Sequence, residues 1–424
     1  MRLRVKTYKY KKIIIIFFSA ILLLLGQKSL IESSAQNYDS IRSTEIFHFD
    51  YIPDDGSYTI SIKDLFGNLE ITGHSGLGAE LIIYKIFQLG TDPEEKERMK
   101  NSNISVVHLK NENRLELYSD PAIQYDIRSQ NKIELKLPIN IAMDVKILGG
   151  DINITDIRGE SFFNTEAGDV FINKHLGRID AQTSGGSIIA KRVSGFNRFH
   201  CTTGSIDITD SDGQLNASTI GGDISLTNFR GGLEIQTVGG SITIQNIKGN
   251  KIYCSTSGGD ISGETISSDV KLETKNGDIY IKDILGEAIL NTSGGDINVK
   301  KHRGPLKCRA SFGDLELLNI IGSTDAFTSA GDILLETLYD SSIEDYSFNI
   351  ETRSGDIGVT IPKGLQVNIE SVLHGTKSIK KLNSEIPIKV VSYENKVVGT
   401  GKIGGGLIPL VLTTYSGSIT INQD

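Results

Sequence analysis

The sequence repeats itself every eighteen residues over about half of its length, and no other feature restricts the fold as strongly. A glycine followed by Asp or Ser and then an aliphatic residue marks each copy. Successive marker glycines from Gly150 to Gly331 are eighteen residues apart, except for an interval of nineteen before Gly259; Gly355 follows after twenty-four residues and Gly417 after a further sixty-two. The markers stand at positions 150, 168, 186, 204, 222, 240, 259, 277, 295, 313, 331, 355 and 417. A fixed period of this length is typical of solenoids, whose repeats bury their apolar faces only by stacking.

Each repeat holds two segments in which apolar and polar residues alternate. The second and fourth residues after a marker glycine are mostly aliphatic, as at Ile242 and Ile244. The residue five positions before the next marker glycine is again apolar, and the residue after it is polar, as at Ile235 and Gln236. Alternation with period two predicts strands with one buried face. A second glycine, nine residues after most markers, supplies the turn between the two strands, as at Gly231.

We therefore predict an all-β chain folded as a parallel β-solenoid with eighteen-residue, two-strand rungs. The repeats occupy residues 148–357. Residues 36–147 are predicted to form an N-terminal β cap, with a short helix over 92–100, and residues 358–424 a C-terminal β cap with a final repeat-like strand. Capped ends are expected because bare solenoid edges polymerise. A meander of antiparallel hairpins is the rival fold, but in it the residues at the same position of successive repeats would not stack on one another in register.

The first 35 residues have the pattern of a secretory signal peptide. Basic residues up to Lys12 precede a mostly apolar stretch, Ile13–Leu25, and small residues at Ser33 and Ala35 favour cleavage after Ala35. An uncleaved anchor is the alternative, but thirteen helical residues cover only ~20 Å of a hydrocarbon core of ~30 Å. We predict an exported protein in the periplasm, on the outer surface or outside the cell, with no transmembrane segment after signal cleavage.

Charge and motif content argue against several classes of function. The residues after position 35 carry a net charge of −14, which disfavours a nucleic-acid partner. The chain contains no HExxH, no GxSxG and no phosphate loop. We therefore expect a protein that is not an enzyme and has no cofactor. Because Asp and Glu are common, a carboxylate pair of the kind that cleaves glycosidic bonds stays an alternative.

Aspartate is the residue directly after the marker glycine in most repeats, so stacked rungs would form a column of carboxylates. Five consecutive rungs would place these carboxylates ~4.8 Å apart, a spacing at which like charges repel unless they are solvated or bridged by a cation. The weak calcium candidates are Asp260, Asp278, Asp296, Asp314 and Asp332. The favoured interpretation is that each aspartate caps its own turn, with no metal bound.

Threonine and cysteine occur on the face that the strands bury. A threonine recurs three residues before most markers, which predicts an internal stack of hydroxyls. Cys201, Cys254 and Cys308 are about three rungs apart, or ~14 Å, which is too far for a disulfide. We predict that all three are buried thiols.

The largest insertion in the repeats lies between Gly331 and Gly355. It carries two tyrosines and an isoleucine among acidic residues, a composition typical of interfaces. Tyr339, Ile343 and Tyr346 are therefore the binding-loop candidates. The alternative is a surface loop without a partner.

The repeated motif resembles a known group of bacterial proteins. Thr256–Ile261, with the sequence Thr-Ser-Gly-Gly-Asp-Ile, is similar to the repeats of a bacterial putative-adhesin β-strand-repeat family of unknown function, related to GIN-domain putative adhesins. The resemblance covers residues 60–424 and includes Phe66–Ile71 and the strand-ending Pro138 and Pro362. It implies a repeat fold in the bacterial envelope or exterior and carries no active site.

These observations together predict an exported, non-enzymatic β-solenoid that presents an extended surface for binding or adhesion. The partner would be a glycan, a protein or another surface ligand. The alternatives are a carbohydrate-active β-helix enzyme and an envelope scaffold or sensor component without an external ligand.

Overall fold

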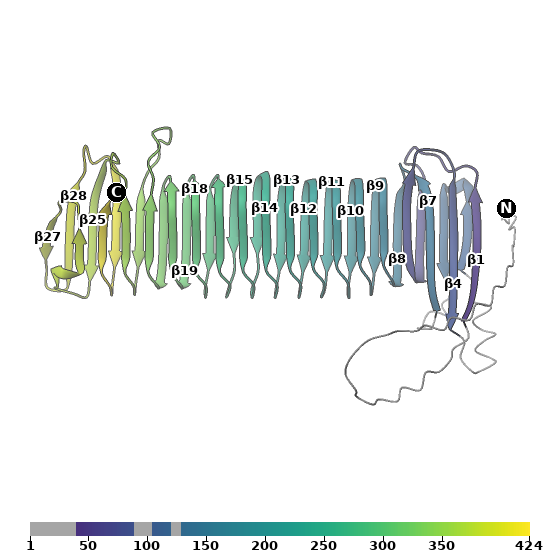
Figure 1. The fold of residues 1–424 in the computed structure, drawn as a ribbon, viewed down its shortest axis with the longest axis horizontal. Helices are drawn as coiled ribbons and strands as arrows, with labels where there is room; N and C mark the ends of the chain where they lie inside the picture. The colour runs from purple at the N-terminus through teal and green to yellow at the C-terminus, as the bar shows by residue number, and fades with distance from the viewer. Residues whose placement is uncertain (1–39, 89–103, 120–128) are drawn as a thin grey trace, which may run out of the picture. The chain divides into compact units, whose positions relative to one another are not determined.

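A computed structural model describes residues 40–88, 104–119 and 129–424 (Figure 1). The predicted signal peptide and the predicted helix over 92–100 lie outside the described residues. Within the described ranges the chain consists of strands, most of them paired in parallel, with two single-turn 3₁₀ segments. The predicted all-β class and parallel pairing are thus confirmed. The chain divides into two compact units, 1–171 and 172–424.

Unit 1 combines parallel and antiparallel pairs. β2 pairs in parallel with β6 and β8, and β3 pairs in parallel with β7 and β9. The antiparallel pairs are β1 with β4, β4 with β7, and β5 with β6. The strands are β1 (Ser40–Phe49), β2 (Thr59–Phe66), β3 (Asn68–His74), β4 (Ala79–Gln88), β5 (Ile104–Leu109), β6 (Arg114–Ser119), β7 (Ser129–Pro138), β8 (Ala142–Gly149) and β9 (Ile152–Thr165), with the 3₁₀ turn η1 (Lys110–Glu112).

Unit 2 contains most of the repeats, one rung after another. In its first rungs a single long strand runs through both halves of the repeat. These strands are β10 (Val170–Thr183), β11 (Ile188–Cys201), β12 (Ile206–Thr219), β13 (Ile224–Thr237), β14 (Ile242–Ser255) and β15 (Ile261–Glu273). β12 lies parallel to β11 with Ile206 opposite Ile188, its equivalent in the preceding repeat. The parallel register rules out the antiparallel meander.

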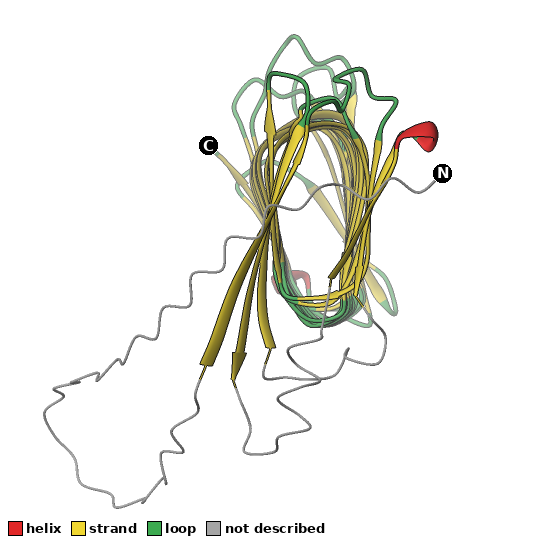
Figure 2. Ribbon diagram, turned by 90° about the vertical axis from the view of Figure 1, so that its right-hand side faces the viewer, coloured by secondary structure: helices red, strands yellow, loops and turns green. Residues whose placement is uncertain are grey.

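From Gly277 onward each half of the repeat is a separate strand. The strands are β16 (Ile279–Leu285), β17 (Ala288–Thr292), β18 (Ile297–Arg303), β19 (Leu306–Phe312), β20 (Leu315–Ile321), β21 (Thr324–Ala330), β22 (Ile333–Thr337), β23 (Phe348–Thr352) and β24 (Ile357–Ile361). Even-numbered strands pair with one another from β16 to β24, and odd-numbered strands from β17 to β23. Unit 2 thus has a first wall, built from the half that follows each marker glycine, and a second wall, built from the other half (Figure 2).

Six side chains of each rung point into the interior between the walls. In the rung of Gly222 they are Ile224, Leu226, Phe229, Leu233, Ile235 and Thr237, all buried. They include the side chains that the sequence predicted to be buried: those two and four residues after the marker glycine, and the one five residues before the next marker. Stacking equivalent side chains on successive rungs removes each of them from water, which is the main stabilising contribution to such a fold.

A left-handed residue explains why the alternation shifts within the first wall. The residue six positions after the marker has φ between 53° and 61° in ten consecutive repeats, although it is never glycine. These residues are Asp156, Lys174, Arg192, Asp210, Asn228, Asn246, Thr265, Asp283, Lys301 and Asn319. Neighbouring rungs share this conformation and stay in register there, and the residue that follows it points inward, as at Phe229.

The marker glycines are required by the close approach of neighbouring rungs. A Cβ atom on Gly240 would lie 2.0 Å from the carbonyl oxygen of Gly222, and equivalent contacts recur at the other markers from Gly204 to Gly417. No larger side chain fits at that distance without moving the backbone.

Strand order and chain order differ at the C-terminal end of unit 2. β29 (Ile408–Thr414) and β30 (Ile419–Gln423) stack directly on β23 and β24. β25 (Val367–His374) and β26 (Leu382–Ser384) come earlier in the chain but pair on the far sides of β29 and β30. β28 (Lys396–Lys402) pairs antiparallel with β25, and β27 (Lys389–Ser392) with β28; the 3₁₀ turn η3 (Ile379–Lys381) precedes β26. The last repeat-like strands are therefore interior members of the two walls.

Candidate functional site

The insertion between β22 and β23 is a surface loop held by its own contacts. Tyr346 is 6% exposed, and its ring lies 5.8 Å from that of Tyr339 and 6.2 Å from that of Phe348. Its phenol oxygen accepts a hydrogen bond from the Asp340 backbone N–H at 2.9 Å. Arg303 forms an ion pair with Asp340. Tyr346 therefore anchors the loop.

Of the three binding-loop candidates, one is well placed to meet a partner. Tyr339 is 49% exposed, whereas Ile343 is half-buried. The burial of Tyr346 follows from its position two residues before β23, where its ring extends the interior past Phe348. The sequence showed an aromatic, acidic loop but not which ring would turn inward.

The acidic column links successive rungs rather than capping its own turns. In each case Oδ1 of one aspartate accepts a hydrogen bond from the backbone N–H of the aspartate one rung later, at 2.7–2.9 Å. The linked residues are Asp260, Asp278, Asp296, Asp314, Asp332 and Asp356. The interpretation that each aspartate caps its own turn was therefore wrong about the partner. Among the described residues, no three or more His, Cys, Asp or Glu side chains are grouped so as to hold a metal ion.

The threonine column is internal, as predicted. The hydroxyl of Thr237 donates to the carbonyl oxygen of Gly222 at 2.9 Å and accepts from the N–H of Gly240 at 3.3 Å. The same pair of bonds recurs at Thr219, Thr256, Thr274 and Thr292. These hydroxyls are committed to the backbone and are not available to a ligand.

The three cysteines are buried thiols, which confirms the prediction. Burial raises the pKa of Cys254 to about 12 and also raises the pKa of Cys308. Both stay protonated at neutral pH, so neither is a nucleophile or a metal ligand.

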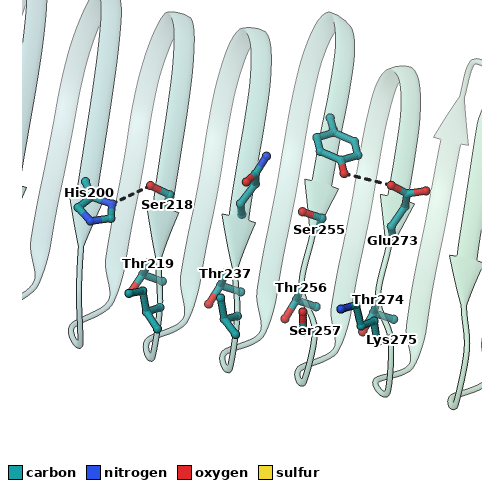
Figure 3. A pocket seen from close by; sticks show the side chains of 14 residues that line it. His200, Ser218, Thr219, Thr237, Ser255, Thr256, Ser257, Glu273, Thr274 and Lys275 are labelled. Carbon is teal, nitrogen blue, oxygen red and sulfur yellow. Dashed lines mark hydrogen bonds between the residues drawn. The ribbon is translucent and has the colours of Figure 1, made fainter.

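A hollow of about 480 Å³ opens on the outward face of the second wall (Figure 3). Its centre follows the polar column four residues before each marker glycine. That column runs His200, Ser218, Gln236, Ser255 and Glu273. Serine reaches less far from a sheet than His, Gln or Glu, so the surface dips at Ser218 and Ser255. The remaining lining residues are Thr219, Ile220, Thr237, Val238, Tyr253, Thr256, Ser257, Thr274 and Lys275.

Glu273 lies at one end of the hollow in a dense set of hydrogen bonds. It accepts from the Tyr253 hydroxyl at 3.0 Å, from the Asn291 amide at 3.0 Å and from Lys271 Nζ at 3.1 Å. Burial disfavours its ionised form, but the three donors together outweigh burial and lower its pKa. Lys271 Nζ also lies 5.3 Å from the centre of the Tyr253 ring. Glu273 is therefore a fixed, ionised acceptor that holds the tyrosine in place.

At the other end, His200 Nδ1 and Ser218 Oγ are 2.9 Å apart and hydrogen-bonded. A serine activated by histidine needs a third group that orients the ring. Glu273, the one carboxylate that lines the hollow, is four rungs away from His200, or ~19 Å at ~4.8 Å per rung. The pair is therefore not part of a catalytic triad.

Three polar groups face the hollow without a partner: two lie between these ends, and the third is on the rung of Glu273. Among the residues that the structure describes, Ser255 Oγ, Gln236 Oε1 and Lys275 Nζ form no hydrogen bond or ion pair. The Gln236 amide nitrogen donates to Glu234 at 3.2 Å, which fixes the direction of the free oxygen. The sequence predicted that this column faces outward, but it gave no sign of the hollow.

Comparisons with known proteins agree with the predicted resemblance. Residues 195–392 match the family model Toastrack DUF4097, which confirms the resemblance to a repeat family of unknown function over those residues. No curated protein matches the chain. A solved structure described as a putative cell adhesion protein from Clostridium sporogenes is 11% identical, covers 91% of this chain and 100% of its own, and has a TM-score of 0.18. At that score it contributes nothing to the arguments on fold or site.

None of the helices in the described part of the chain is long and apolar enough to cross a membrane.

Proposed function

We propose that this chain, whose residues 195–392 match the Toastrack DUF4097 family, is an exported, non-enzymatic β-solenoid that binds a partner at the bacterial envelope. The binding surface is the outward face of the second wall. The observation that carries the proposal is the hollow on that face, with Ser255, Gln236 and Lys275 left without partners. Exposed polar groups held on a rigid sheet form a prearranged surface, which reduces the entropy lost on binding.

Regular rungs make this surface continuous. We propose that the eighteen-residue, two-strand rung is the unit throughout residues 148–357, with residues 36–147 and 358–424 as caps. In such a stack every rung adds one residue to each outward column at a constant spacing. A long ligand would then meet one side chain of the column at each regular interval.

Catalysis is less well supported than binding. Cleavage of a glycosidic bond generally needs two carboxyl groups about 5–10 Å apart. Glu273 is the one carboxylate among the residues that line the hollow, and its lowered pKa disfavours the protonated form that a general acid needs. Tyr339 on the insertion loop is proposed as a secondary contact, because it is the most exposed of the three loop candidates.

The experiment is a surface-binding assay with a matched pair of variants. The labelled protein is incubated with intact bacterial and host cells, and bound label is measured by flow cytometry. Ser218→Arg fills the hollow on the second wall, while Ser225→Arg places the same side chain on the first wall, at an equally half-buried serine. We expect binding that Ser218→Arg weakens at least tenfold and Ser225→Arg leaves unchanged. Absence of binding to every surface, or equal loss in both variants, would contradict the proposal.

A further inference from the structure

We propose that the hollow on the second wall binds an uncharged, linear glycan, with several consecutive sugar residues lying along the stack of rungs. This inference rests on the proposed binding function and names the chemical class of its ligand. It is carried by three properties of the hollow: its hydrogen-bonding groups, its charge balance and its length.

The hydrogen-bonding groups suit hydroxyls. A sugar hydroxyl both donates and accepts, so it is best met by a mixture of donors and acceptors. In the hollow, the Ser255 hydroxyl can both donate and accept a hydrogen bond. The Gln236 side-chain carbonyl oxygen accepts, and the Lys275 ammonium donates. They come from three successive rungs, so one ligand that crosses the strands can reach all of them.

Charge balance favours an uncharged ligand. The lining includes one carboxylate, Glu273, and one ammonium group, Lys275. Glu273 is already neutralised by Lys271 at 3.1 Å, and Lys275 is exposed, so water and salt screen its charge. An acidic glycan would find a single lysine and a fixed carboxylate, and a cationic ligand would find a carboxylate whose acceptor positions are occupied.

Apolar groups at the edge of the hollow complement the C–H faces of sugar rings. Ile220 and Val238 are 52% and 54% exposed on adjacent rungs. Tyr253, within β14, also lines the hollow, and Glu273 holds its hydroxyl. A rigid aromatic ring with a hydrogen-bonded hydroxyl presents apolar area at little entropic cost.

The size of the hollow fits a short stretch of a chain. Its polar column crosses from His200 to Glu273, or ~19 Å over four rung spacings. A volume of about 480 Å³ lies within the usual range of ligand sites. The hollow is open at the surface and has polar and apolar lining in similar amounts, whereas the centre of a protein–protein interface is depleted in charge and rich in buried aromatic residues. The lining therefore favours a glycan over a protein partner.

Binding to purified oligosaccharides tests the ligand class directly. Titration calorimetry of the full protein against neutral linear oligosaccharides of increasing length should give an affinity that rises with length and then levels off once the hollow is spanned. Matched oligosaccharides that contain uronic acids should bind at least tenfold more weakly. If no neutral oligosaccharide binds, or if the acidic ones bind more tightly, the inference is overturned.

A second pair of variants links the binding to the hollow. Ser255→Leu fills the hollow, and Ser262→Leu makes the same change on the outward face of the first wall, at another half-buried serine. We expect Ser255→Leu to weaken oligosaccharide binding at least tenfold and Ser262→Leu to leave it unchanged, with equal melting temperatures. Equal affinities of the two variants would assign the glycan to a different surface.

Treatment of the bound cell surface separates this inference from the proposed function. Periodate oxidises the vicinal diols of glycans, whereas protease removes protein partners. Binding that periodate abolishes and protease spares supports the glycan. Binding lost to protease alone would overturn the glycan but retain the binding function, and absence of any surface binding would overturn both.

Discussion

Asp296 and Asp314 are one repeat apart in the sequence and are joined by a hydrogen bond, in which the backbone N–H of Asp314 donates to Oδ1 of Asp296 at 2.8 Å. The same link continues along the column from Asp260 to Asp356. Each carboxylate thus accepts an N–H at the corner of the following rung. The second oxygen of Asp296 is left to water, because the side chain is exposed.

Two substitutions at Asp296 separate its hydrogen bond from its charge. Asp296→Ala removes the acceptor for the Asp314 N–H and should lower the free energy of unfolding by about 1 kcal/mol. Asp296→Asn keeps an oxygen acceptor and removes one of several neighbouring like charges, so its stability should equal or exceed that of the parent. Urea denaturation of both variants measures the difference. Equal losses in the two would mean that charge, not the hydrogen bond, matters at this position.

Calcium should leave the stability unchanged. Each aspartate of the column uses one oxygen for the next rung, and the described residues contain no group of three ligating side chains. A ligand at a hundred times its dissociation constant would add ~2.7 kcal/mol. Thermal melts with millimolar calcium and with a chelator should therefore coincide. A melting temperature that rises with calcium would restore the calcium candidates.

Asn197 is a fully buried amide with neither polar atom hydrogen-bonded. It faces Leu215 on the next rung, and most residues of its column are aliphatic. Leaving buried polar atoms unpaired costs about 1–3 kcal/mol each. Asn197→Leu should therefore stabilise unit 2 by about 2 kcal/mol. A lower melting temperature of this variant would indicate that the amide has a partner in solution.

Two buried histidines should make the protein sensitive to mild acid. Burial lowers the pKa of both His175 and His302 to about 4, from an ordinary value near 6.5. Between those values the unfolded chain binds protons that the folded chain does not, so stability is complete above pH 6.5 and is lost as the pH falls toward 4. Each histidine contributes at most about 3 kcal/mol to this loss.

His302→Ile tests that pH dependence. His302 lies between Ile284 and Ile320 in the stack, so isoleucine continues the column. The variant should be as stable as the parent or more so at pH 7, and its stability should fall less between pH 6.5 and pH 4.5. An unchanged pH profile of the urea midpoint would exclude this histidine as a cause.

Thr265 is the β-branched member of the left-handed column, with φ of 57°. A branched side chain is strained in that conformation, whereas asparagine tolerates it. Thr265→Asn should therefore raise the free energy of unfolding by about 0.5–1 kcal/mol. Asn246→Thr, the reverse change one rung earlier, should lower it by a similar amount. The idea fails if the two variants shift the melting temperature in the same direction.

The sequence predicted the features that period-two alternation makes visible. Ile242 and its equivalents are buried because aliphatic residues recur there in every repeat, and Thr237 is internal because it shares a face with Ile235. The left-handed residues were not predicted, because Asp, Asn, Lys, Arg and Thr occupy that column and no single residue type marks it.

The candidate site was less accessible to sequence reasoning. The outward direction of Ser255 followed from alternation, but the hollow depends on how short side chains lie beside long ones on neighbouring rungs. The burial of Tyr346 likewise depends on how the insertion folds back over Phe348. Both are consequences of packing between residues far apart in the chain, which a repeat pattern does not encode.

The strand order at the C-terminal end has a consequence for how the protein is completed. β25 pairs with β29, and β26 with β30, so neither has its parallel neighbour until a later part of the chain has been added. During synthesis from the N-terminus, the chain can stack the earlier rungs as they are made. Within residues 367–402, however, β25 and β26 still lack their parallel partners at that stage. Parallel pairing at this end can therefore be completed only after the last strand, β30, has been made.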